Sequence, residues 1–156
     1  MRIAIAMAIL LVGFGTLSAQ NAQPQPLTPA FLLGEDETSY EKLCEAHPRT
    51  LLAVSNNDIE LALKNWFSFL RNVDQYAKTI NFDMKGLKVW LHVFWNADGS
   101  VAHIGFFVMP NSRNVKTEEL KALFSGFIRQ YKPVLTSDRS FSHYTSAAFP
   151  LVSERK

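Results

Sequence analysis

The clearest pattern along the chain is an alternation of side-chain character in two neighbouring segments, residues 87–95 and 101–109. A period of two residues is typical of β-strands, in which successive side chains point to opposite faces of a sheet. Between the segments lies Asn96-Ala97-Asp98-Gly99, a turn sequence whose glycine readily adopts a positive φ. The pattern therefore predicts a β-hairpin with a four-residue turn.

The turn length sets the register, placing His92 opposite His103 and Leu91 opposite Ile104. This register makes one face of the hairpin wholly apolar and leaves the other mixed. The apolar face contains Leu87, Val89, Leu91, Val93, Ala102, Ile104, Phe106 and Val108. The mixed face contains Lys88, Trp90, His92, Phe94, Val101, His103, Gly105 and Phe107. We expect the apolar face to be buried beneath helices.

Two further segments repeat apolar residues at helical spacing and predict amphipathic helices. The first covers residues 58–80, with Asn57 as N-cap and Glu60 completing a capping box. Its apolar stripe comprises Ile59, Leu63, Trp66, Phe67, Leu70, Val73, Ala77 and Ile80. The second begins after an N-cap at Thr117 and ends before Pro133. Its stripe comprises Leu120, Leu123, Phe124, Phe127, Ile128 and Tyr131.

The remaining elements have weaker signals. A helix of one or two turns is expected over residues 40–46, and a short strand over residues 50–55. A last strand is expected within residues 141–152, where Pro150 favours an edge position. The resulting order, (β)αββαβ, predicts an α+β fold: a small antiparallel sheet with two amphipathic helices on one face.

The N-terminus has the pattern of a secretory signal peptide. Arg2 precedes an apolar run over residues 3–14, which is followed by the small residues Gly15, Thr16, Ser18 and Ala19. Because this run is shorter than the roughly 20 apolar residues that span a bilayer, we expect cleavage near Ala19 rather than a membrane anchor. The expected location is therefore periplasmic or secreted, where the protein could associate with the cell envelope. The predicted organisation is a signal peptide at 1–19, a flexible Gln/Pro-rich leader at 20–34, one domain at 35–152 and a tail at 153–156.

Composition narrows the functional classes. The 156 residues are 47% hydrophobic and 12% aromatic, which indicates one domain with a packed core rather than a disordered chain. The net charge of +2 is too small to indicate a nucleic-acid partner.

Cys44 is the only cysteine, so no intramolecular disulfide can form. We interpret it as a buried small hydrophobe, with a free thiol or an intermolecular link as alternatives.

The C-terminal half of the chain carries an ordered set of features. They are a strand before an acidic-glycine turn (VFWNADGSV), a second strand, a Ser/Asn-rich connection, a helix ending in Tyr131-Lys132-Pro133, and a closing strand. Together with the preceding helix, residues 58–152 resemble the C-terminal domain of TonB-type energy transducers. The resemblance implies a TonB C-terminal-like α+β fold and a peptide-binding habit. It does not imply energy transduction, because we expect neither a retained anchor nor a long Pro-rich spacer.

Candidate chemistry centres on the histidines. In the predicted register His92 and His103 are cross-strand neighbours, and His143 on the last strand could approach them, which would make a weak candidate metal site. Ordinary histidines on a half-exposed sheet face are the alternative that we favour. No nucleophile elbow, phosphate-binding loop or dinucleotide fingerprint occurs, so we expect no enzymatic activity and no cofactor. A hydrolase-like enzyme with an unrecognised site is a further alternative.

The mixed hairpin face is the strongest candidate for a binding surface. We expect Trp90, His92, Phe94, His103 and Phe107 to contact a protein or peptide partner. The alternative is that residues 31–54 cover this face. Pairing of an edge strand with a peptide, or with a second copy in a homodimer, is another route to a partner. The second functional hypothesis is a small-ligand or metal-binding protein that uses the same His/aromatic face.

Overall fold

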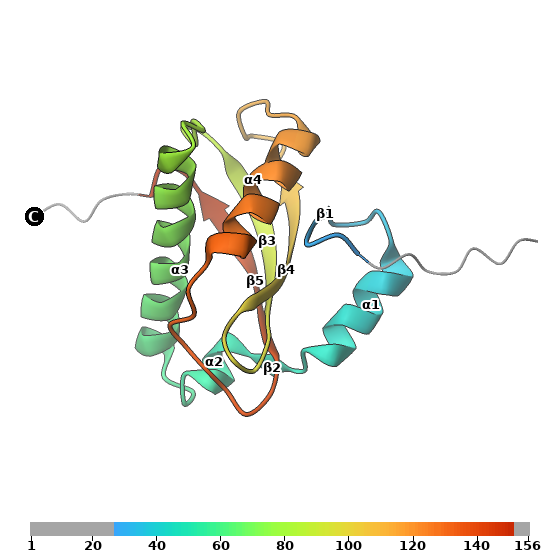
Figure 1. The fold of residues 1–156 in the computed structure, drawn as a ribbon, viewed down its shortest axis with the longest axis vertical. Helices are drawn as coiled ribbons and strands as arrows, with labels where there is room; N and C mark the ends of the chain where they lie inside the picture. Colours follow the sequence, from blue (N-terminus) through green and yellow to red (C-terminus); the bar gives the residue numbers. More distant parts are fainter. Residues whose placement is uncertain (1–26, 152–156) are drawn as a thin grey trace, which may run out of the picture.

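The computed structural model describes residues 27–151, which form five strands and four helices (Figure 1). The strands are β1 (Ala30–Leu32), β2 (Arg49–Thr50), β3 (Lys88–Trp95), β4 (Val101–Val108) and β5 (Phe141–Ala148). The helices are α1 (Glu37–Ala46), α2 (Leu51–Val54), α3 (Ile59–Thr79) and α4 (Thr117–Gln130). The predicted α+β class is confirmed. The predicted signal peptide, the first part of the leader and the tail lie outside the described residues.

One mixed sheet, in the order β1-β4-β3-β5-β2, organises the fold. Its three central strands are antiparallel, whereas β1 pairs with β4 and β2 with β5 in parallel. Helices α3 and α4 lie on one face, and α1 lies on the other side of the sheet (Figure 1). The core between the sheet and the two long helices includes Phe69, Leu91, Phe106, Phe124 and Phe141.

The hairpin forms as predicted, but its register differs by two residues. Leu91 faces Phe106 and His92 faces Gly105, rather than Ile104 and His103. The loop between the strands contains five residues instead of four, and Ala102 has no partner because of a β-bulge. The extra loop residue and the unpaired Ala102 shift the register by two residues in total. Because side chains alternate with a period of two, each residue largely keeps the face that was predicted for it. Val101 is the exception: it joins the main core.

Two predicted N-caps are shifted by one residue. Asp58, not Asn57, caps α3, and its carboxylate accepts a hydrogen bond from the Leu61 amide. Asn57 instead adopts a positive φ of 58°. Thr117 is the first residue of α4, and the cap position belongs to Lys116, whose side chain makes no capping bond.

The chain before α3 differs most from the prediction. Residues 50–55 were predicted to be a strand, but β2 ends at Thr50, whose hydroxyl caps the single turn α2. The flexible leader predicted through residue 34 is wrong for Ala30–Leu32, which form the buried strand β1. The short helix predicted at residues 40–46 is confirmed as the last part of α1.

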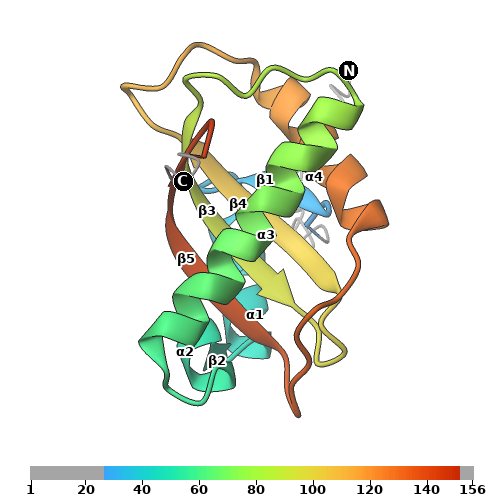
Figure 2. The same ribbon diagram turned by 90° about the vertical axis from the view of Figure 1, so that its left-hand side faces the viewer.

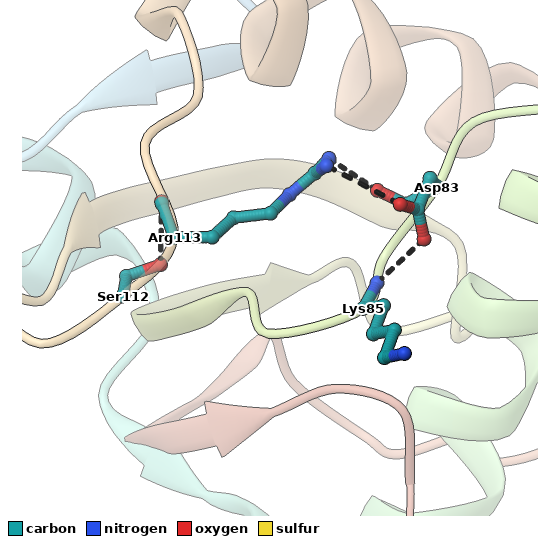
Figure 3. A network of polar contacts seen from close by, with 4 residues as sticks. All are labelled: Asp83, Lys85, Ser112 and Arg113. Carbon is teal, nitrogen blue, oxygen red and sulfur yellow. Dashed lines mark hydrogen bonds and ion pairs between the residues drawn. The ribbon is translucent and has the colours of Figure 1, made fainter.

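The loops at one end of the sheet are tied together by Arg113 (Figure 3). Its guanidinium donates hydrogen bonds to the carbonyl and the carboxylate of Asp83, and its backbone amide donates to the Gly86 carbonyl. Asp83 also accepts from the Lys85 amide. These contacts hold the α3–β3 loop against the β4–α4 loop.

In residues 27–151, none of the helices is both long and apolar enough to cross a lipid bilayer.

Candidate functional site

The predicted binding face is partly covered by α1, as one of the sequence-based alternatives proposed. Phe94 has no exposed surface. The His47 ring lies edge-on to it with centroids 5.2 Å apart, and the Tyr40 ring lies 6.3 Å away in a similar orientation. Phe94 is therefore a core residue of the α1 side, and its prediction as a contact residue is wrong.

His92 is also engaged within the fold. Its Nδ1 atom shares a hydrogen bond of 2.9 Å with the hydroxyl of Tyr40. Burial, reinforced by nearby His143 and His47, lowers the pKa of His92 to about 4, so the ring is neutral at pH 7. Burial is likewise the main cause that raises the pKa of Tyr40 to about 12. The pair thus holds α1 on the sheet rather than presenting a free imidazole.

The other predicted contact residues lie beyond the cover of α1. Trp90 and Phe107 face each other across β3 and β4, and Phe107 is 46% exposed. Trp90 stacks on Tyr144 of β5 at 5.3 Å. His103 lies at the margin, with its Nδ1 atom 3.1 Å from the Thr28 carbonyl oxygen. The structure therefore leaves a small aromatic patch in place of the continuous face that was predicted.

The three histidines proposed as weak metal ligands do not converge. His143 lies on the opposite face of the sheet, against the indole of Trp66 at 4.8 Å. His92 faces Gly105 instead of His103. In residues 27–151 no three His, Cys, Asp or Glu side chains are grouped so that they could hold a metal ion. The predicted convergence is wrong because side chains alternate between the two faces of a strand.

Cys44 is half-buried rather than fully buried, and it is a free thiol. Burial raises its pKa, which disfavours the reactive thiolate at neutral pH. A hydrogen bond with the Tyr40 side chain acts in the opposite direction on the pKa of Cys44 but does not outweigh burial.

The outer edge of β5 is paired over only a short part of its length. Only Phe141 and Ser142 pair with β2, so in the described part of the chain residues 143–148 have no strand on their outer side. Alternate N–H and C=O groups of an edge strand point outward and can pair with another chain. Figure 2 shows β5 on the outside of the sheet with α3 crossing beside it.

A groove of about 1040 Å³ runs between this edge and α3. Thr145, Ser146, Ala147 and Ala148 form the strand side, and Leu63, Trp66, Phe67 and Leu70 form the apolar part of the helix side. Leu63 and Phe67 are 50% and 47% exposed, although both belong to the apolar stripe of α3. Large apolar side chains beside an unpaired strand edge are the two parts that strand addition needs.

In comparisons with known proteins, no family model, no curated protein and no solved structure matches this chain. The resemblance to TonB-type transducers therefore stays a prediction.

The sequence contained a signal for the groove that the prediction did not use. The apolar stripe of α3 extends from Trp66 and Leu70 to Leu63 and Phe67, which is wider than the sheet can cover. Phe69, absent from the predicted stripe, is buried, whereas Phe67 is exposed. The rotation of α3 about its axis, which the sequence does not determine, decides which side of the stripe remains outside.

Proposed function

We propose that this chain is an exported, non-enzymatic module that binds an extended segment of another protein at the outer edge of β5. One observation carries the proposal: the unpaired edge of β5 and the exposed apolar residues of α3 border the same groove. A strand added to β5 would gain main-chain hydrogen bonds along the edge. Its side chains on the helix side would cover Leu63 and Phe67.

Three features support binding rather than catalysis. The groove is open and lined mainly by apolar and small residues, with the hydroxyls of Thr145 and Ser146 among them. Among the residues that line the groove no histidine lies beside these hydroxyls as a general base for a catalytic nucleophile. The one carboxylate, Asp74, is bonded to Lys78 at 2.7 Å. The proposal of export rests on the signal-peptide pattern of residues 1–19.

The test begins with selection of binders from a random displayed 12-residue peptide library on the full chain. The tightest peptide is then synthesised with single N-methyl groups along its backbone. N-methylation removes an amide donor, so in strand addition it should abolish binding at alternate positions and be tolerated between them. A uniform tolerance of N-methylation would contradict strand addition.

A matched pair of double variants locates the site. Leu63→Ala/Phe67→Ala removes the two exposed apolar residues of the groove and should weaken binding about tenfold or more. Leu52→Ala/Phe107→Ala removes a leucine and a phenylalanine of similar exposure elsewhere, 39% and 46%, and should leave affinity unchanged. The opposite result would move the binding surface to the Trp90/Phe107 patch.

A further inference from the structure

The groove carries a surplus of positive charge. Its ionisable residues are Lys64, Arg71, Asp74 and Lys78. Asp74 and Lys78 neutralise each other in an i,i+4 ion pair. Lys64 and Arg71 are exposed, and neither forms an ion pair with another residue of the described segment. Two cations are thus left beside the β5 edge.

The spacing of these cations suits an extended ligand. Lys64 and Arg71 are seven positions apart on α3, which corresponds to about 10 Å along the helix axis. In an extended strand, side chains on one side recur about every 7 Å. Two carboxylates on the same side of an added strand would therefore lie within reach of the two long, flexible cationic side chains.

We infer that the ligand of the groove is an extended acidic segment of a partner protein, in which both Asp or Glu and apolar residues occupy the alternate positions whose side chains face α3. The inference rests on the proposed function and adds the charge of the partner. The apolar residues would contact Leu63 and Phe67, and the carboxylates would pair with Lys64 and Arg71.

The same charges disfavour a second copy of this chain as the occupant. A symmetric pairing of two β5 edges keeps both α3 helices on the same face of the joined sheet. Each groove would then bring Lys64 and Arg71 toward the equivalent residues of the other copy. Like charges placed opposite each other oppose association.

The test repeats the peptide selection on three forms of the full chain: the wild type and two double charge variants. Peptides selected on the wild type should be enriched in Asp and Glu over Lys and Arg. The enrichment should disappear with Lys64→Gln/Arg71→Gln. It should persist with Arg129→Gln/Lys132→Gln, which removes one exposed arginine and one exposed lysine outside the groove.

Affinity provides the second readout. Replacing both acidic residues of a selected peptide by Gln should weaken its binding about fivefold at low salt, and the difference should vanish at high salt.

Selected peptides without acidic enrichment would overturn the inference but leave the peptide-binding function standing, provided that binding still requires Leu63 and Phe67. Equal loss of enrichment in both charge variants would also overturn it, because the effect would then come from overall charge. Failure to select any peptide that requires Leu63 and Phe67 would overturn the proposed function as well.

Discussion

The two outer edges of the antiparallel centre differ in how they are closed. On the β4 side, β1 pairs along Ile104–Phe106, and the flanking backbone adds bonds from the Ile104 amide to Pro29 and from the Leu33 amide to Phe106. The chain then continues into α1, which covers the adjacent sheet face. On the β5 side, β2 pairs with only two residues. The antiparallel centre is therefore covered along part of β4 by β1 and left open along most of β5, where another strand could pair.

The largest expected effect on stability is at the sheet face that α1 covers, on the β4 side. Phe94→Ala should lower the free energy of unfolding by about 3–4 kcal/mol, because it empties a fully buried ring site between His47 and Tyr40. Phe107→Ala, on the same face but beyond α1, should cost less than about 1 kcal/mol. Urea denaturation of both variants measures the difference. Similar losses in the two variants would mean that α1 does not bury Phe94 in a second core.

A substitution at the closed edge comes next. A Cβ atom at Gly105 would lie 2.8 Å from Leu33 and from the buried ring of Phe31, so Gly105→Val should displace β1. We expect a loss of about 1–3 kcal/mol in unfolding free energy. Ala148→Val, at the exposed end of β5, should change it by no more than about 0.5 kcal/mol. Equal effects at both edges would contradict the contrast between them.

The stability of the α1 side of the sheet should depend on pH. The pKa of His92, about 4 in the fold, lies below the ordinary histidine value of 6.5, so at intermediate pH the unfolded chain binds more protons than the folded chain. The contribution of neutral His92 to the free energy of unfolding should therefore be fully present above about pH 6.5 and decline as the pH falls toward 4. Allowing for solvent screening, the loss is about 1–2 kcal/mol. His47 and His143, whose pKa values are also lowered by burial, act in the same direction.

Thermal unfolding between pH 7.5 and pH 4.5 measures this dependence. His92→Asn keeps a hydrogen-bonding side chain at this position but removes the titrating ring, so its melting temperature should fall less over the same range. A wild type and a variant with parallel pH profiles would show that His92 does not couple α1 to protonation.

The smallest effect on stability is expected at the open side. Leu63→Ala/Phe67→Ala removes side chains that are about half exposed and replaces them with the best helix former. The free energy of unfolding should therefore fall by less than about 1 kcal/mol, as measured by urea denaturation. A loss as large as that of Phe94→Ala would mean that these residues belong to the core and not to a docking surface.

Local patterns in the sequence were sufficient to predict the central elements. Period-two alternation and the Asp98-Gly99 turn identified the hairpin, and helical spacing identified α3 and α4. The short strands β1 and β2 were not identified, because two or three residues carry no periodicity and their parallel pairing is with distant segments. The register error arose from the five-residue loop together with the bulge at Ala102, which no local signal marks.

The candidate site was less predictable than the fold. Burial of Phe94 depends on how α1 returns over the sheet, and the open edge of β5 depends on β2 ending at Thr50. Both are non-local consequences of chain topology. The surplus width of the apolar stripe on α3 was visible in the sequence, but only the position of the sheet showed that Leu63 and Phe67 lie outside it.

Amide hydrogen exchange of β5 with and without a selected peptide distinguishes strand addition at this edge from binding elsewhere. In the free protein, alternate amides of residues 143–148 should exchange rapidly, whereas the Ile104 amide, bonded to Pro29, should be protected. Addition of the peptide should slow the rapid β5 amides by about tenfold or more, because strand addition supplies their missing acceptors. Peptide binding that leaves these amides unchanged and instead perturbs Trp90 and Phe107 would rule out strand addition at β5.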